Sequence, residues 1–404
     1  MNKRIYVDNS ATSRPFPEVI EVMNRYYHDQ WGNPSSAHSF GRSLRAEIQS
    51  ARDLIAEVIN ASPKEVIFTS GGTESDNIAL KGAMLSRPER NHLMVSAIEH
   101  PAILSTAQYL QKGGSELTTL KVNEEAEVSI SDLRDHISDK TAIVSVMSAN
   151  NEVGSIQPIE EMVSIAKEHN ALFHADCVQS FMKEEIDVKK LDLDLASFSA
   201  HKVNGPKGVG LLYIKKGVKI DPLTHGGHHE FKKRAGTENV AAILGFAKAV
   251  EIGLKNMKQQ VKDSKLLRNS LEEKLKRDIP NIKINAINTK RLPNISNISF
   301  ECVEGEALLI RLDLKGVLIS TGSACSSGSL EPSHVLMAMK IPHELAHGSI
   351  RFSFGHGNSM DDVDYIVEAV KDVVQKVREI SPLWDSFKNR PISMSDAQAN
   401  VTTY

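Results

Sequence analysis

The chain has 404 residues, of which 41% are hydrophobic and 25% charged, and its formal net charge is −3. This balance is typical of a soluble globular protein long enough for two domains, and it gives no support for nucleic-acid or membrane binding. No apolar run approaches the roughly 18 residues of a membrane span. Three cysteines, Cys177, Cys302 and Cys325, are too few for a disulfide framework. The small number of cysteines and the lack of an apolar leader in the first residues predict a cytoplasmic protein.

The first two thirds of the chain predict an α/β domain. Helices are expected over residues 17–27 and 41–59. Between about positions 63 and 215, short apolar runs alternate with amphipathic stretches. The expected strands are 65–69, 92–98, 141–148, 171–176, 194–200 and 208–214. Runs that are apolar throughout are typical of strands covered on both faces, and their alternation with helices predicts a mainly parallel sheet.

The composition changes at about position 239. A long helical region to about position 277 is expected to bridge two domains, and shorter strands and helices follow it as a smaller α+β domain. We predict a large domain over 15–258. The small domain would comprise 1–14 and 259–380 and carry Cys325, and 381–404 would form a C-terminal tail.

Three motifs place reactive groups where strands are expected to end. Lys202 follows the strand 194–200 in "SFSAHKVNGPKGVG". Ligands of open α/β sheets bind at the carboxyl ends of strands, and a partly desolvated lysine there can form a Schiff base. A solvated surface lysine is the ordinary alternative. Ser199 and His201 beside it could donate hydrogen bonds to a phosphate.

The second and third motifs suit a phosphorylated ring. In "FTSGGTESDN" a strand enters a helix through two glycines, so the helix start and Thr73 could bind an anion, although a simple turn is the alternative. In "FHADCVQS", Asp176 at a strand end needs a partner such as a protonated ring nitrogen, unless it only caps a helix. Gln179 could face the same cavity. Together the three motifs predict pyridoxal phosphate at the top of a parallel sheet.

Longer motifs identify a resemblance. They follow one another in the order seen in cysteine desulfurases of the NifS/IscS type: "TSGGTESDN", "EHPAIL", "NNEVG", "HADCVQS", "SFSAHKVNGPKGVG", "RAGTENV", "GSACSSGSLEPSHVL" and "SIRFSFG". The resemblance covers the chain from about Tyr6 to Trp384. That family belongs to the class V aminotransferase group of fold type I pyridoxal phosphate enzymes. The resemblance therefore implies a mainly parallel, seven-stranded-type sheet with helices on both faces, plus the smaller domain.

The resemblance also implies catalytic roles. Lys202 would carry the cofactor as a Schiff base and move the substrate's α-proton. His100 would stack on the cofactor ring and take part in proton transfer. Cys325 would be the nucleophile that takes sulfur from the substrate. Arg351 would bind the substrate carboxylate through a bidentate fork, with help from Asn33.

The remaining implied roles concern cofactor binding. Asp176 would pair with the pyridine nitrogen, Gln179 would contact the phenolic oxygen, and Asn151 would lie against the cofactor. Thr237 would reach the phosphate from the other subunit, which implies a homodimer. The residues expected to hold the phosphate are Gly72, Thr73, Ser199 and His201.

The resemblance predicts conversion of L-cysteine to L-alanine, with sulfur held as a persulfide on Cys325. The acceptor would be an iron–sulfur scaffold or another sulfur-acceptor protein, and Cys325 could be a transient cluster ligand in that complex. No other metal site, nucleic acid or membrane is expected. A selenocysteine lyase or another class V aminotransferase is the alternative enzyme, and a non-enzymatic cofactor-binding scaffold is the third possibility.

Other histidines and cysteines have competing interpretations. "HELAH", residues 343–347, matches a zinc-protease pattern, but Pro342 and Gly348 leave room for one helical turn only. His225, His228 and His229 could form a metal cluster, whereas His228 and His229 could instead line the cofactor mouth or have no role. Cys302 is expected to be inert and buried, and the sequence leaves the role of Cys177 open.

Overall fold

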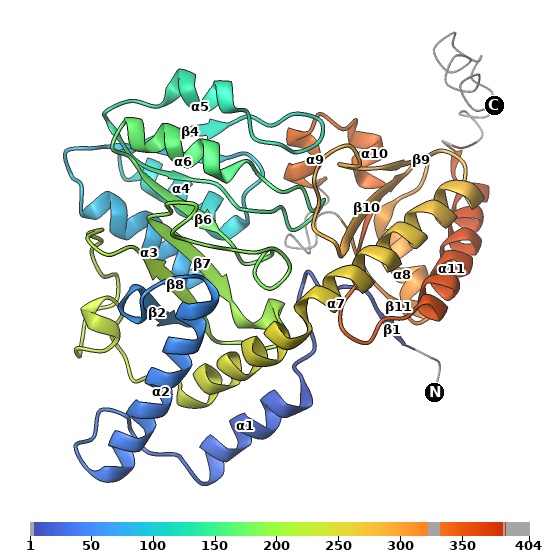
Figure 1. Cartoon of the computed structure of the whole chain (residues 1–404). Helices are drawn as coiled ribbons and strands as arrows, with labels where there is room; N and C mark the ends of the chain where they lie inside the picture. Colours follow the sequence, from blue (N-terminus) through green and yellow to red (C-terminus); the bar gives the residue numbers. More distant parts are fainter. Residues whose placement is uncertain (1–3, 322–331, 383, 385–404) are drawn as a thin grey trace.

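The computed structural model describes residues 4–321, 332–382 and 384 (Figure 1). Its centre is a seven-stranded sheet with the strand order β2-β8-β7-β6-β5-β3-β4. The bounds are β2 (Val66–Thr69), β3 (His92–Ser96), β4 (Glu116–Leu120), β5 (Thr141–Ser145), β6 (Leu172–Asp176), β7 (Leu195–Ser199) and β8 (Gly210–Ile214). Only β8 runs antiparallel to its neighbours in this sheet, so the mainly parallel sheet is confirmed.

Helices cover both faces of this sheet, because alternate strand residues are apolar on each side. Ile67, Val95 and Leu172 pack with α3 (Gly72–Leu85) and α4 (Pro101–Lys112) on one face. Phe68 and Phe173 belong to the core of the opposite face. The helices of that core are α2 (Ser39–Val58), α5 (Ile130–His136), α6 (Ile159–Glu168) and the first half of α7 (Val240–Asp278).

A smaller α+β part lies beside the large sheet. It has a second, antiparallel sheet in the order β12-β13-β10-β9 and a parallel β1–β11 pair. The strands are β1 (Ile5–Tyr6), β9 (Ile282–Ile284), β10 (Ile295–Phe300), β11 (Val317–Leu318), β12 (Ser320–Thr321) and β13 (Ser349–Ser353). Helices α8 (Gly305–Leu314) and α11 (Met360–Glu379) share its core, whereas α9 (His334–Ala338) and α10 (His343–His347) pack against the core of the large sheet.

Helix α7 joins the two parts, as Figure 1 shows. Its residues Ile243, Phe246 and Val250 pack in the core of the large sheet, and Leu267 and Leu271 pack in the core of the smaller part. The long helix expected to about position 277 is therefore confirmed. The domain boundaries stay a prediction, because α7 continues unbroken past position 258.

Short elements complete the chain. Helix α1 (Pro17–His28) begins at its proline, and three 3-10 turns are η1 (Pro63–Glu65), η2 (Ala200–Lys202) and η3 (Glu230–Lys232). In the part of the chain that the structure describes, no helix has the length and apolar character that crossing a bilayer requires.

Candidate active site

Several of the predicted site residues lie where the parallel strands of the large sheet end. Strands β2, β7, β6, β5 and β3 all point the same way, so their carboxyl ends meet there. Asp176 ends β6, and Lys202 follows β7 in η2. His100 precedes α4, and Asn151 lies in the segment after β5. The sheet therefore brings together residues that are up to about a hundred positions apart in the chain.

The start of α3 has backbone features that favour the binding of an anion. Gly71 has φ 155° and ψ −178°, a conformation that is essentially restricted to glycine. A Cβ on Gly72 would lie 2.9 Å from Val178 Cγ2 and 3.8 Å from Ser199 Cβ, so the missing side chain lets the helix start approach β6 and β7. Thr73 lies exposed in the first turn. The backbone N–H groups and the positive end of the helix dipole favour an anion at this place.

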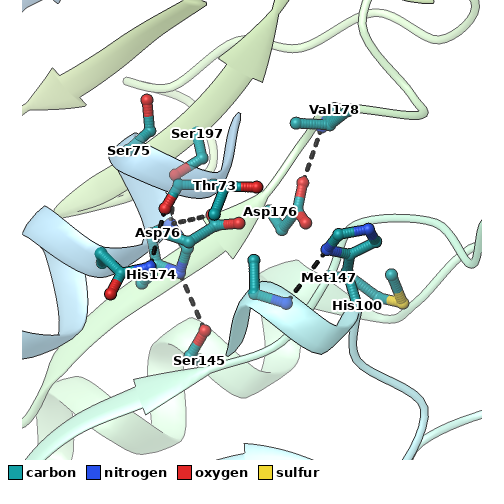
Figure 2. Close-up of polar contacts among 12 residues, drawn as sticks. Thr73, Ser75, Asp76, His100, Ser145, Met147, His174, Asp176, Val178 and Ser197 are labelled. Atoms are coloured by element: carbon teal, nitrogen blue, oxygen red, sulfur yellow. Dashed lines mark hydrogen bonds and ion pairs between the residues drawn. The ribbon is translucent and has the colours of Figure 1, made fainter. Parts of the chain in front are cut away.

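Asp176 is a buried carboxyl group at the end of β6. Its Oδ1 accepts a hydrogen bond from Val178 N at 2.9 Å (Figure 2). Burial raises the pKa of its carboxyl to about 6, and the positive charge of Lys202 opposes that rise. A cationic partner would lower the pKa further and keep the carboxylate ionised.

A buried polar network, which the sequence did not predict, lies next to Asp176. His174 Nδ1 is 2.8 Å from Ser145 Oγ, its Nε2 is 2.9 Å from Ser197 Oγ, and the same Nε2 is 3.7 Å from Asp76 Oδ1 (Figure 2). Burial lowers the pKa of His174 to about 3. Burial, followed by the charge of Asp176, raises the pKa of Asp76 well above its usual value. Burial therefore favours the uncharged forms of both Asp76 and His174.

Lys202 and Gln179 meet at the N-terminal segment of the chain. Lys202 Nζ donates hydrogen bonds to the carbonyl oxygens of Ser10, at 2.5 Å, and Ala11, at 2.8 Å. Gln179 Nε2 donates to the same Ser10 oxygen at 2.9 Å. Gln179 Oε1 is buried and has no hydrogen-bond partner among the described residues. Since buried polar atoms are normally paired, this atom indicates a site built for a polar ligand.

His100 is held as an uncharged ring. Its Nδ1 accepts a hydrogen bond from Ala102 N at 3.1 Å, which leaves the proton of the neutral ring on Nε2. Burial lowers the pKa of His100 to about 4, and the charges of Lys202 and His334 lower it in the same direction. His201 is similar, with Nδ1 3.2 Å from Thr12 Oγ1 and a pKa of about 4, mainly because of burial.

Arg351 reaches this edge from β13 of the smaller part. Its side chain is almost completely buried, its Nη1 donates to Asn151 O at 3.0 Å, and its Nη2 donates to Asp8 Oδ1 at 2.8 Å. Its buried Nε has no partner among the described residues. Asp8 was not predicted from the sequence. The guanidinium is thus fixed in place with further donors to offer to a carboxylate.

Two predicted residues lie on exposed loops. Asn33 lies between α1 and α2, and Thr237 lies just before α7. His229 connects the two loops, because its Nε2 is 3.3 Å from Ser35 Oγ and its Nδ1 accepts from Gly236 N at 3.3 Å. The exposure of Thr237 is compatible with a contact to a second subunit, and its role stays a prediction, as does that of Asn33.

Cys325 lies outside the described residues. The described chain resumes at Pro332 and contacts the site there, since the Ser333 hydroxyl donates to the Glu152 carboxylate. His334 Nε2 lies 2.9 Å from Glu99 O, next to His100. The segment that begins at Pro332 is therefore anchored to the loops that carry Asn151 and His100.

Cys177, Cys302 and the "HELAH" segment lie in three different parts of the fold. Cys177 is buried one residue after Asp176, and burial raises its pKa to about 12. Cys302 is half-buried in the turn after β10. The "HELAH" segment forms the five-residue helix α10, in keeping with the single turn expected. No group of three metal-ligating side chains suited to a metal ion occurs within the described ranges.

The fold and this set of side chains define a class of enzyme, and comparison with known proteins identifies it. The chain belongs to the class-V aminotransferase family, whose family model matches residues 5–366. Cysteine desulfurase IscS of Clostridium botulinum is 47% identical over 394 residues, which cover 96% of this chain and 99% of that protein. Within the family, the chain is one of the cysteine desulfurases.

Solved structures agree with this assignment. A NifS-like protein superposes with a TM-score of 0.86 at 37% identity, over 93% of this chain and all of that one. A structure described as SspA in complex with cysteine has a TM-score of 0.78 at 33% identity, over 87% of this chain and 99% of that one. The expected fold type and family are therefore confirmed.

Proposed function

We propose that the chain uses pyridoxal phosphate to convert L-cysteine to L-alanine and holds the released sulfur as a persulfide on Cys325. The observation that carries this proposal is the convergence of Lys202, Asp176, His100 and the helix start at Gly72 on one edge of the sheet. The naming of its relatives as cysteine desulfurases favours this reaction over a selenocysteine lyase or a transaminase.

The residues present fit the cofactor. When bound, it supplies an electron sink for the electron pair left at the substrate's α-carbon. Asp176 would hold the ring nitrogen in its protonated state, and Gln179 and Asn151 would fix the ring from its other edges. His100 would stack on the ring face. The phosphate would be held by Gly72, Thr73, Ser199 and His201, with Thr237 of a second subunit.

The chain's own groups would carry the remaining steps. Arg351 would orient the substrate carboxylate, together with Asn33, and Lys202 Nζ would accept the α-proton and later return it. The Cys325 thiolate would attack the substrate sulfur, so that the carbon–sulfur bond breaks and a sulfur–sulfur bond forms. In total, cysteine and one protein thiol give alanine and one protein persulfide, and no external oxidant is needed.

The finer biological assignments are proposals of the same kind. An iron–sulfur scaffold is the acceptor we propose, with Cys325 as a transient cluster ligand in that complex. A homodimer is proposed because Thr237, which the family resemblance assigns to the phosphate of the other subunit, lies exposed on the loop before α7. A cytoplasmic location stays a prediction.

Two variants test the proposal. In Cys325→Ser, alanine release from cysteine should fall by at least about 100-fold while the cofactor's absorbance near about 400 nm persists. Cys302→Ser is the matched control and should keep full activity. In Lys202→Ala that absorbance should disappear. Full desulfurase activity in Cys325→Ser, or an unchanged band in Lys202→Ala, would remove the respective residue from the mechanism.

A further inference from the structure

An ionised carboxylate lies in the first turn of α3, directly after Gly72 and Thr73, which were assigned to the phosphate. Glu74 Oε2 accepts a hydrogen bond from Ser70 N at 2.5 Å. Burial raises the pKa of the Glu74 carboxyl, but hydrogen bonds from Arg234 and Ser70 lower it by more, so its pKa lies below the usual value. Glu74 is therefore negatively charged at neutral pH. Such a charge opposes the binding of a phosphate, so its presence here needs an explanation.

Arg234 supplies the compensating positive charge. Its Nε donates to Glu74 Oε1 at 2.8 Å and its Nη2 donates to Glu74 Oε2 at 3.3 Å, so the two side chains form a two-point ion pair. The side chain of Arg234 is 24% exposed and that of Glu74 is 19% exposed, which limits the screening of their charges by water and salt. The pair holds the carboxylate in one position and opposes its charge at the start of α3.

A second ion pair fixes the loop that carries Arg234. The two carboxylate oxygens of Glu230 accept from the buried Arg52 guanidinium, each at 2.7 Å, and Oε2 also accepts from Phe68 N in β2 at 2.8 Å. Residues 230–232 of this loop have positive φ values of 42°, 54° and 66°. This left-handed conformation is unfavourable for residues other than glycine, so surrounding contacts must hold it. The loop thus binds β2 through Glu230 and α3 through Arg234, on both sides of the glycine turn.

A separate feature of this end of the sheet also indicates a polar ligand. The start of α3 packs against the segment after β6, since a Cβ on Gly72 would lie 2.9 Å from Val178 Cγ2. The next residue, Gln179, has a buried Oε1 without a hydrogen-bond partner among the described residues. Because buried polar atoms are normally paired, the ligand expected here would meet both the helix start and this acceptor.

We propose that Arg234 is a positioning residue for the cofactor, which neutralises the Glu74 carboxylate and fixes the start of α3 so that this helix end can bind the phosphate of pyridoxal phosphate. This inference deepens the proposed function and rests on the assignment of Gly72 and Thr73 to the phosphate. An ion pair that only stabilised the turn would behave differently. Removing both of its charges would then weaken phosphate binding as much as removing one.

The test compares two compounds that differ in the phosphate group. The full-length apoprotein is titrated with pyridoxal phosphate and with pyridoxal near neutral pH, and each Kd is obtained by equilibrium dialysis. Both compounds offer the same ring to the protein, so a change in the ratio of the two Kd values between variants reports on the phosphate. Damage to the fold or to the ring site would instead weaken the binding of both compounds.

Four variants separate charge from structure. Arg234→Gln should lower the preference for pyridoxal phosphate over pyridoxal by about tenfold or more, since the uncompensated carboxylate repels the phosphate. Adding Glu74→Gln to this variant should restore the preference to within about threefold of the wild type, because glutamine is uncharged and can still accept from Ser70 N. Arg234→Lys keeps the charge and should also stay within about threefold. The control Arg291→Gln removes a two-point ion pair with Glu272, between the loop before β10 and α7, and should leave the preference unchanged.

Two results would overturn the proposal. One is an unchanged preference in Arg234→Gln, and the other is a double variant that binds the phosphate as weakly as Arg234→Gln alone. A different result would show that the underlying function is at fault. If the wild type binds pyridoxal phosphate no more tightly than pyridoxal, the phosphate site assigned to Gly72 and Thr73 fails, and this inference fails with it.

Discussion

Replacing Arg351 by lysine should separate charge from geometry in substrate binding. The wild-type guanidinium donates to Asn151 O and Asp8 Oδ1 at the same time and keeps Nε for a further acceptor. A lysine at this position retains the positive charge but has a single donor nitrogen. It can therefore satisfy Asp8 or a substrate carboxylate, but it cannot present the two parallel N–H groups of an arginine.

The size of the effect follows from the bonds that are lost. A hydrogen bond to a charged group contributes about 1.5–3 kcal/mol when its partner is buried. Arg351 is 1% exposed, so water cannot replace the missing donor. The loss of one such bond to the substrate carboxylate predicts a decrease of roughly 10- to 150-fold in kcat/KM for cysteine.

Alanine release measured over a range of cysteine concentrations gives kcat/KM directly. The cofactor's absorbance should be unchanged, because Arg351 is assigned to the substrate. Arg268→Lys is the matched control, since Arg268 is also buried and donates to Leu292 O at 2.7 Å, in the part of α7 that packs on the smaller core. It should lower stability and leave kcat/KM within about twofold. A kcat/KM for Arg351→Lys within twofold of the wild type would refute the assignment of Arg351.

Three further predictions concern buried groups. Burial raises the pKa of Glu99 to about 8, so the free energy of unfolding should fall as the pH rises from about 4.5 to 8. In thermal denaturation, Glu99→Gln should remove about 3–5 kcal/mol of this pH-dependent loss of stability. The control Glu57→Gln, at an exposed position, should leave the loss unchanged. His100→Gln should slow alanine release about 100-fold or more, equally at pH 6 and 8, because the ring is already uncharged; a ratio that differs between these pH values would contradict this. Glu230→Gln leaves the buried Arg52 partly uncompensated and should cost about 3–5 kcal/mol in urea denaturation, and a loss below 1 kcal/mol would show that this ion pair is not needed.

The sequence predicted the buried elements better than the exposed ones. The six expected strands of the large sheet all form, because they are apolar on both faces and the sheet buries both faces. Strand β4 was missed: it lies at the sheet edge and most of its residues are exposed or half-buried. The apolar run at residues 317–321 is divided into β11 and β12, which pair in different sheets. Such pairing depends on distant partners that no local pattern specifies.

The candidate site was predictable where it depends on strand ends. Lys202 and Asp176 could be placed because a polar residue directly after an apolar run marks the end of a strand. Asp8 could not, because its position depends on how the N-terminal segment folds against the site. His174 did give a signal, a polar residue inside an apolar strand, and its partners became known only from the fold.

The burial of Cys177 should prevent this thiol from competing for the sulfur that the enzyme transfers. A thiol whose pKa is raised to about 12 is almost entirely protonated near neutrality and is a poor nucleophile toward a persulfide. Although Cys177 follows Asp176 directly, it should neither take the transferred sulfur atom nor form an internal polysulfide that would inactivate the enzyme. Turnover should therefore continue at high cysteine concentrations without self-inactivation by this side chain.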